Sequence, residues 1–265
     1  MYSVIASDLD GTLLSNEHTL TPFARQTLQR MVAKDIKFIF ATGRHHVDVN
    51  SIREGLGFDA FMITSNGARV HNKAGELIAA HNIDESLIDE LLSVAKGYDD
   101  IYTHVYTGDK WYVDRDIYEE EDFFKDSKFS YEIYADEKVD KKDIFKIFYT
   151  AQDPKSLRPV EVIIESRFKG MLSMAHSSLN CFELMANGVS KGAALKEVLA
   201  LKGYTLADCI AFGDGMNDVE MLSVVGKGHI MKNADPRLIA KLPHLEIIGS
   251  NSEDAVIQKI IEYFD

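Results

Sequence analysis

The stretch Val4-Ile5-Ala6-Ser7-Asp8-Leu9-Asp10-Gly11-Thr12 decides how the rest of the chain is interpreted. Its apolar start predicts a buried strand, and the glycine that follows predicts the turn that ends the strand. Two carboxylates would then stand at the carboxyl end of a strand, where open α/β sheets bind their ligands. That much negative charge at one strand tip costs stability unless a cation offsets it. The stretch therefore predicts a site for a divalent metal.

The composition is that of an ordinary globular protein. The chain has 265 residues, of which 46% are hydrophobic and 27% charged, enough for one large domain or two smaller ones. Its formal net charge is -13. Because nucleic-acid binding depends on clustered Lys and Arg, and no basic stripe is present, nucleic acid is not an expected partner.

Neither a membrane nor a disulfide is expected from the sequence. Asp8 and Asp10 interrupt the first apolar run before a signal peptide could form, and no apolar run is long enough to span a bilayer. Cys181 and Cys209 are distant in sequence and lie in apolar surroundings, which predicts two buried thiols. These features favour a cytoplasmic enzyme.

Strands and helices alternate through the first third of the chain, and the same alternation returns after residue 190. This order predicts a parallel, doubly wound sheet of the α/β class, similar to a Rossmann fold. The expected strands are 4–6, 37–41, 60–65, 209–212 and 228–231, and the expected helices begin at Pro22, Val47, Lys191 and Ala255.

The pattern is interrupted between the two halves. A hairpin is expected around residues 72–75. Residues 84–185 lack the regular alternation of strands and helices, and their sequence predicts short strands rich in Tyr and Phe. We therefore predict a catalytic core formed by residues 1–83 and 186–265. An α+β cap domain, residues 84–185, is inserted into it and is expected to set substrate specificity.

Polar clusters follow three of the predicted core strands, and a fourth begins a helix. In a parallel sheet the carboxyl ends of the strands lie along one rim, so these clusters should converge. They are Asp8 with Asp10, then Thr42, then Asp214 with Asn217 and Asp218, and finally Lys191.

Such a rim could transfer a phosphoryl group. Carboxylates supply oxygen ligands for Mg2+, which lets an anionic phosphate approach an anionic carboxylate. A carboxylate can then act as nucleophile and form an acyl phosphate. Thr42 and Lys191 would donate to the phosphoryl oxygens, where charge is spread in the transition state.

Four ordered motifs resemble those of the haloacid dehalogenase-like (HAD) phosphatases, and the resemblance covers essentially the whole chain. The insertion resembles the large class IIB cap of the Cof-type subfamily, and the match is closest to bacterial sugar-phosphate and pyridoxal-phosphate phosphatases. The motifs are Asp8-Leu9-Asp10-Gly11-Thr12, Thr42-Gly43-Arg44, Ser190-Lys191-Gly192 and Gly213-Asp214-Gly215-Met216-Asn217-Asp218.

The resemblance implies a role for each acidic residue of the first and last motifs. Asp8 would be the nucleophile and also a ligand to Mg2+. Asp10 would be the general acid and then the base, and its main-chain carbonyl would reach the metal. Asp214 would be the third protein ligand.

The resemblance also implies the groups around the metal and the phosphate. Asp218 would orient the metal site from behind its ligands. Asn217 would bond a phosphate oxygen or Asp8. Thr42, Gly43 and Lys191 would hold the phosphoryl group.

Several neighbouring residues are left without an assigned role. Arg44, His45 and His46 follow Thr42 at a helix start, and one of them could touch substrate. Side chains at consecutive positions do not share a helix face, so a joint metal site of the two histidines is not expected.

Two further positions have open interpretations. Asn66-Gly67 could line the rim or simply form a turn, and Glu183 could contact substrate or Lys191 or be structural.

We therefore expect a Mg2+-dependent phosphatase whose substrates are small phosphorylated metabolites, with sugar phosphates and pyridoxal 5'-phosphate foremost. One alternative is a phosphomutase or phosphotransferase that uses the same aspartyl-phosphate chemistry. Another is a signalling receiver module that accepts phosphate on an aspartate. Such modules lack an acid two residues after the nucleophile, so Asp10 argues against this class.

Overall fold

The computed structural model describes residues 2–117, 129–135 and 138–265. The chain forms two compact units, a core unit made of Met1–Ala79 with Ser190–Asp265 and an inserted unit made of Ala80–Val189. The insertion expected at residues 84–185 lies within the second of these units.

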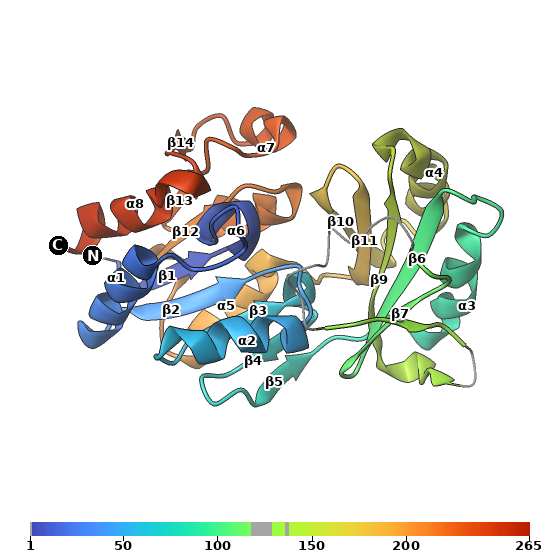
Figure 1. The fold of residues 1–265 in the computed structure, drawn as a ribbon, viewed down its shortest axis with the longest axis horizontal. Helices are drawn as coiled ribbons and strands as arrows, with labels where there is room; N and C mark the ends of the chain where they lie inside the picture. Colours follow the sequence, from blue (N-terminus) through green and yellow to red (C-terminus); the bar gives the residue numbers. More distant parts are fainter. Residues whose placement is uncertain (1, 118–128, 136–137) are drawn as a thin grey trace. The chain divides into compact units, whose positions relative to one another are not determined.

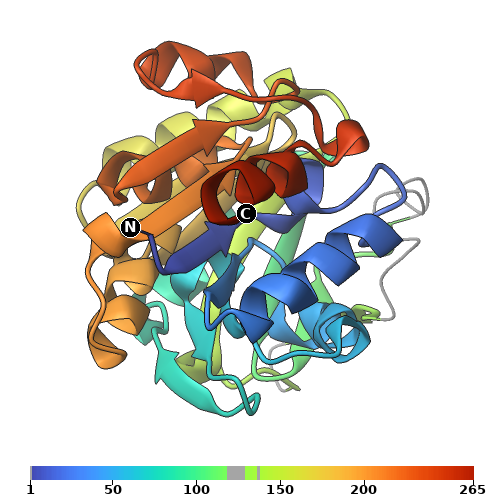
Figure 2. The ribbon, with the colours of Figure 1, turned by 90° about the vertical axis from the view of Figure 1, so that its left-hand side faces the viewer.

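The core unit is a doubly wound α/β sheet (Figures 1 and 2). Its strands are β1 (Val4–Ser7), β2 (Lys37–Ala41), β3 (Phe61–Thr64), β4 (Arg69–His71), β5 (Leu77–Ala80), β12 (Cys209–Gly213), β13 (Lys227–Ile230) and β14 (Glu246–Ile247). Its helices are α1 (Pro22–Ala33), α2 (His46–Leu56), α5 (Lys191–Leu201), α6 (Val219–Val224), α7 (Pro236–Lys241) and α8 (Ala255–Phe264).

The strand order of this sheet is β14-β13-β12-β1-β2-β3-β4-β5. The pairs from β14 to β3 are parallel, whereas β3 and β4 pair antiparallel as the expected hairpin begins. The strand that precedes Asp8 is therefore central, with β12 on one side and β2 on the other. This order confirms the α/β fold class with a large parallel sheet.

Alternate residues of each core strand face opposite sides of the sheet, and helices cover both sides. Phe38 and Phe40 of β2 pack in one apolar core with α1, α2 and α8. Ile39 and Ala41 of the same strand pack in a second core with α5, α6 and α7. Because helices cover both faces of the sheet, the central strands have nearly continuous apolar sequences.

Local capping fixes where two of these helices begin. Thr21 precedes Pro22 and accepts a hydrogen bond from the amide of Ala24, as the sequence predicted for α1. Ser190 accepts a bond from the amide of Ala193 at the start of α5. The cap of α5 matters for the site because Lys191 is the first residue of that helix.

Among its described residues, the inserted unit forms a six-stranded sheet with two α-helices. Its strand order is β10-β11-β9-β6-β7-β8, antiparallel except for the β7 and β8 pair. Its elements are α3 (Glu85–Val94), β6 (Ile101–Thr107), β7 (Lys110–Val113), β8 (Glu132–Ile133), β9 (Ile144–Ala151), α4 (Arg158–Arg167), β10 (Leu172–Ser178) and β11 (Cys181–Ala186). Both helices pack on one face of the sheet through a shared apolar core.

Two core elements, α7 and β14, were not predicted. They are 6 and 2 residues long, too short to give a clear periodic signal. Both cysteines are buried thiols, as expected. Across the described ranges, every helix falls short of the length and apolarity needed to cross a bilayer.

Candidate active site

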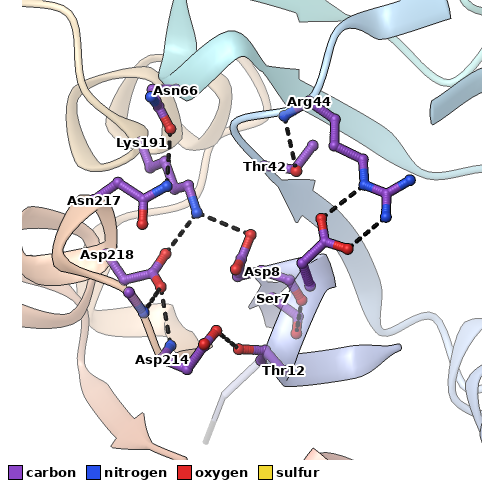
Figure 3. A network of polar contacts seen from close by, with 12 residues as sticks. Ser7, Asp8, Thr12, Thr42, Arg44, Asn66, Lys191, Asp214, Asn217 and Asp218 are labelled. Carbon is purple, nitrogen blue, oxygen red and sulfur yellow. Dashed lines mark hydrogen bonds and ion pairs between the residues drawn. The ribbon is translucent and has the colours of Figure 1, made fainter. Parts of the chain in front are cut away.

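Asp8 directly follows β1 in the middle of the parallel sheet. Its amide donates to the carbonyl of Phe212 in β12 (3.0 Å), so the ends of the two strands are held together. The Asp8 side chain is 9% exposed. Figure 3 shows it at the centre of a polar network that draws on β1, on the loop after β12 and on the start of α5.

Lys191 joins two of the carboxylates. Its Nζ lies 2.8 Å from Oδ1 of Asp8 and 2.7 Å from Oδ1 of Asp218, and the lysine is buried. Burial alone would lower the pKa of Lys191, but the attraction of Asp218 and Asp8 outweighs it and raises that pKa. Lys191 is therefore a permanent cation at this point.

Both oxygens of Asp218 are used within the protein. Oδ1 accepts from Lys191, and Oδ2 accepts from the amides of Asp214 (3.0 Å) and Gly215 (2.9 Å). These bonds shape the loop after β12 and fix the position of Asp214. Asp218 consequently supports the site from behind rather than presenting a free oxygen to a ligand.

Asp214 faces Asp8 from the neighbouring strand end. Oδ1 of Asp214 accepts a bond from the hydroxyl of Thr12 (2.6 Å). Gly11 has φ of 69°, and a Cβ at Gly11 would stand 2.4 Å from Oδ2 of Asp214. A glycine is thus required here both by the backbone conformation and by the approach of the carboxylate.

The chemistry of these side chains suits a divalent cation. Carboxylate oxygens of Asp8, Asp214 and Asp218 lie within 4.8 Å of one another, and no other such trio of His, Cys, Asp or Glu occurs in the described part of the chain. Three carboxylates against the single ammonium of Lys191 leave two negative charges without compensation. A divalent cation held by Asp8 and Asp214 would balance them, and Mg2+ prefers such oxygen ligands.

The pKa values of the same group reflect this excess charge. Burial raises the pKa of Asp8 well above its usual value, and Lys191 opposes the rise. Burial and the neighbouring Asp218 raise the pKa of Asp214 to about 7. Both carboxyls therefore gain from a nearby cation that stabilises their ionised forms.

Asp10 is held apart from this trio by two basic side chains. Nε of Arg44 donates to Oδ2 of Asp10 (2.7 Å), a second guanidinium nitrogen bonds Oδ1 (2.5 Å), and Nδ1 of His18 lies 3.1 Å from Oδ1. Burial alone would raise the pKa of Asp10, but these bonds outweigh it and hold the pKa well below its usual range. Asp10 is a carboxylate in this arrangement.

The loop after β2 brings Thr42 to the same rim. Its Oγ1 accepts from the amide of Arg44 (3.1 Å), and no contact among the described residues uses the hydroxyl as a donor. Backbone bonds tie this loop to the next one, from the amide of Asn66 to the carbonyl of Thr42 (3.0 Å). Gly43 lies between Thr42 and Arg44 in this loop.

Asn217 points toward the rim from the last motif. Its Nδ2 donates to Oδ1 of Asn66 (3.0 Å), so the side chain is bonded to a neighbouring loop rather than to Asp8. Asn66 and Gly67 adopt positive φ values of 55° and 104°. The Asn66-Gly67 turn thus both reverses the chain into the hairpin and borders the site.

The adjacent histidines do not both lie on a helix. His45 is the residue before α2 and has an extended backbone (φ -68°, ψ 148°), so the rule for consecutive helix positions does not apply to it. The rings of His45 and His46 stack with centroids 4.3 Å apart, and the ring of His71 lies 4.7 Å from that of His46. The prediction that they do not form a joint metal site stays a prediction.

Glu183 has a partner within the inserted unit. Its Oε1 pairs with Nζ of Lys146, and both side chains are buried. The ammonium of Lys146 also lies over the rings of Tyr106 and Phe148. This pair gives Glu183 a structural role, the third of the readings considered for it.

The rim therefore brings together most of the residues singled out in the sequence. Figure 3 shows a network that contains Asp8, Thr42, Lys191, Asp214, Asn217 and Asp218. Asp10 borders it through its bonds to Arg44. Their roles in binding and catalysis stay predictions.

Sequence reasoning assigned no role to two residues that the network contains. Thr12 hydrogen-bonds Asp214, and its only sequence signal is its place in the first motif. Arg44 binds Asp10, and its signal is its place directly after Thr42-Gly43.

Known proteins are similar to this chain over nearly its whole length. The family model of haloacid dehalogenase-like hydrolases matches residues 5–260. A Haemophilus influenzae protein named "Putative phosphatase" is 41% identical over 264 residues, covering 99% of this chain and 97% of its own. An HMP-PP phosphatase of Cronobacter sakazakii is 36% identical over 262 residues, covering 98% and 95%.

Solved structures are also similar to this chain. The solved structure of a haloacid dehalogenase-like hydrolase from B. subtilis superposes with a TM-score of 0.87 and 27% identity, covering 99% of this chain and 100% of the other. A sugar phosphatase of HAD subclass IIB superposes with a TM-score of 0.83 at 20% identity, covering 98% of each chain, which shows a common fold.

Proposed function

Because this chain belongs to the haloacid dehalogenase-like hydrolases, we propose that it is a Mg2+-dependent phosphatase of small phosphomonoesters. The observation that carries the proposal is the group of Asp8, Asp214 and Asp218 around the buried Lys191. That group has a nucleophilic carboxylate, a fixed cation and an uncompensated negative charge suited to a divalent metal. Asp10, two residues after Asp8, adds a group for proton transfer.

Asp8 would attack the phosphorus atom of the substrate. Lys191 occupies Oδ1 of Asp8, whereas Oδ2 has no hydrogen-bond partner among the described residues and is open to an incoming phosphate. A bond forms between Asp8 and phosphorus as the ester P–O bond breaks. Mg2+ would supply charge neutralisation, so that an anionic phosphate can approach an anionic carboxylate.

Lys191 and Thr42 would bind the phosphoryl oxygens. The ammonium of Lys191 is fixed by Asp218 as well as by Asp8, so it needs no rearrangement when charge develops on the phosphoryl group. The hydroxyl of Thr42 is available as a donor because its oxygen already accepts from Arg44. Gly43, in the same loop, brings backbone close to the phosphate, and Asn217 borders it from the opposite loop.

Asp10 would move the protons of both steps. The departing alkoxide takes a proton from Asp10, and the resulting carboxylate then takes one from the water that cleaves the aspartyl phosphate. Arg44 holds Asp10 as a carboxylate here, the form needed for the second step. Protonating a leaving group requires Arg44 to release Asp10.

We propose small phosphorylated metabolites as substrates, with sugar phosphates and pyridoxal 5'-phosphate foremost. Relatives at 35–36% identity are named HMP-PP phosphatase, so that compound joins the candidates. The inserted unit would select among leaving groups.

The test is a phosphate-release screen over these compounds with Mg2+, run beside Asp8→Asn. We expect turnover of at least one compound by the natural chain and a loss of at least a thousandfold in the variant. Full activity of Asp8→Asn would overturn the proposal. Transfer of labelled phosphate to a second acceptor, without release, would indicate a phosphotransferase instead.

A further inference from the structure

A pocket of about 230 Å³ lies in the core unit, away from the carboxyl ends of the strands. Its floor contains Val4, Ile39 and Phe61, the first or an early residue of β1, β2 and β3. Val198 and Leu199 of α5 form an apolar wall. The candidate active site is at the other end of the same strands, so the pocket belongs to a different region of the core unit.

Lysines are also among the residues that line this pocket. The ammonium of Lys202 lies 5.2 Å from the centre of the Phe61 ring, and that of Lys73 lies 6.0 Å from it. The two lysines come from the end of α5 and from the β4–β5 turn, 129 positions apart in the chain. Only the tertiary structure therefore gathers both cations over one ring.

Neither ammonium forms an ion pair with a carboxylate of the described residues, although the charge of Asp35 also acts on Lys73. Lys37, a third lysine of the pocket, is paired with Asp35. No carboxylate oxygen of the described residues lies within 4 Å of the ammonium of Lys73 or Lys202. In a chain of net charge -13, an apolar pocket lined by three lysines, with Asp35 as the one carboxylate shown to act on them, is a local concentration of positive charge.

The pocket is small. Its volume of about 230 Å³ lies below the roughly 300–1,000 Å³ of typical ligand pockets, which favours one small ring system over a nucleotide. The apolar floor and the Phe61 face favour a flat apolar body, and the lysines favour a negative charge on it. Tyr204 also lines the pocket and offers a phenol hydroxyl.

From this convergence of Lys73 and Lys202 over Phe61, we propose that the pocket is a second binding site, for a small aromatic anion that carries a carboxylate or phosphate. The ring would lie against the floor, and the anionic group would reach the two ammonium groups. This site is independent of the proposed phosphatase activity, because it shares no residue with the network around Asp8.

Indole-3-acetate is a suitable probe, with indole and acetate as matched controls for its ring and its charge. Titration of the full chain, followed by amide NMR shifts, should show saturable changes at Phe61, Lys202 and Tyr204 with indole-3-acetate. We expect indole and acetate to bind at least tenfold more weakly. Saturating Mg2+ and inorganic phosphate should leave the titration unchanged, because we expect them to bind at the candidate active site around Asp8.

The double variant Lys73→Met with Lys202→Met should weaken binding of indole-3-acetate about tenfold or more. The control variant Lys196→Met with Lys232→Met removes the same charge from exposed positions, one of them on α5, and should bind as the natural chain does. Lys202→Gln alone should weaken binding about threefold, which keeps the test valid if the double variant does not fold. The absence of saturable shifts, equal binding of indole, or equal loss in the control variant would overturn the proposal.

Discussion

Nζ of Lys191 lies 2.8 Å from Oδ1 of Asp8, although 183 positions separate the two residues in the chain. The same ammonium is 2.7 Å from Asp218. This buried cation is the one positive charge among three carboxylates, so it bears on both the stability and the chemistry of the site.

Replacing Lys191 by Met should destabilise the metal-free protein by about 3–5 kcal/mol, because Asp8 and Asp218 then share buried charge with no cation between them. Urea unfolding in the presence of EDTA measures this. Lys196→Met, an exposed position on the same helix, should change stability by less than about 0.5 kcal/mol. Similar values for the two variants would show that Lys191 does not hold the cluster together.

Mg2+ should stabilise the folded chain. At one hundred times its dissociation constant, a metal that binds only the folded state adds about 2.7 kcal/mol, or roughly 5 °C or more in midpoint temperature. Thermal unfolding with Mg2+ and with EDTA measures the difference. Asp214→Asn should abolish the shift, and Asp208→Asn, before β12, should keep it. A metal shift that persists in Asp214→Asn would place the cation elsewhere.

Arg44→Met should move the pH dependence of catalysis. Arg44 holds the pKa of Asp10 below its usual range, so its removal leaves burial to act alone and raises that pKa. The limb of the pH–rate profile controlled by Asp10 should therefore shift to higher pH. Arg158→Met, an exposed substitution in the inserted unit, is the control. An unshifted profile would mean that Arg44 does not set the protonation of Asp10 during turnover.

Gly67→Ala should damage the site more than its location in a turn suggests. Gly67 has φ of 104°, and a Cβ there would stand 2.5 Å from the carbonyl oxygen of Ser190, the cap that precedes Lys191. We expect a loss of about 2–4 kcal/mol and a displaced start of α5. Gly188→Ala also has a positive φ but has open space around it, so it should cost only about 1 kcal/mol. Equal losses in urea unfolding would contradict the steric argument.

Acid should weaken the inserted unit through His104. Burial, with a smaller contribution from Lys146, lowers the pKa of His104 from 6.5 to about 3. Below pH 6.5, His104 is therefore protonated in the unfolded chain but stays neutral in the folded chain. The free energy of unfolding consequently falls as the pH decreases, down to about pH 3. Between pH 6.5 and 5 the expected loss is about 2 kcal/mol.

The fluorescence of Trp111 can follow this unfolding, because it is the only tryptophan and its Nε1 donates to Nδ1 of His104 (3.2 Å). His104→Gln should remove most of the dependence on pH between 6.5 and 5. The exposed His81→Gln should retain it. If His104→Gln loses stability over this interval as steeply as the natural chain, another group is responsible.

Much of the core unit could be predicted because its local signals agree with its tertiary packing. The strand at 37–41 and the helices beginning at Pro22, Lys191 and Ala255 combine apolar patterns with clear ends. The order of strands and helices then requires a parallel sheet with its ligands at one rim. The weak signals failed where elements are short, as in α7 and β14.

Contacts between side chains of distant segments could not be predicted in the same way. The bond from Thr12 to Asp214, the pair formed by Arg44 and Asp10, and the stacked rings of His45 and His46 depend on backbone angles at single residues. A difference of one dihedral angle turns a side chain to another neighbour, and local patterns do not specify such angles.

The sequence by itself determined the α/β order of the core and four motifs, three of them at strand ends and one at a helix start, because periodicity and turn residues act locally. Only the tertiary structure decided which charges meet. It placed Lys191 between Asp8 and Asp218, used both oxygens of Asp218, and bound Asp10 to Arg44. Electrostatic interactions depend on the distance between charges in space and on their burial. The separation of two residues along the chain specifies neither of these.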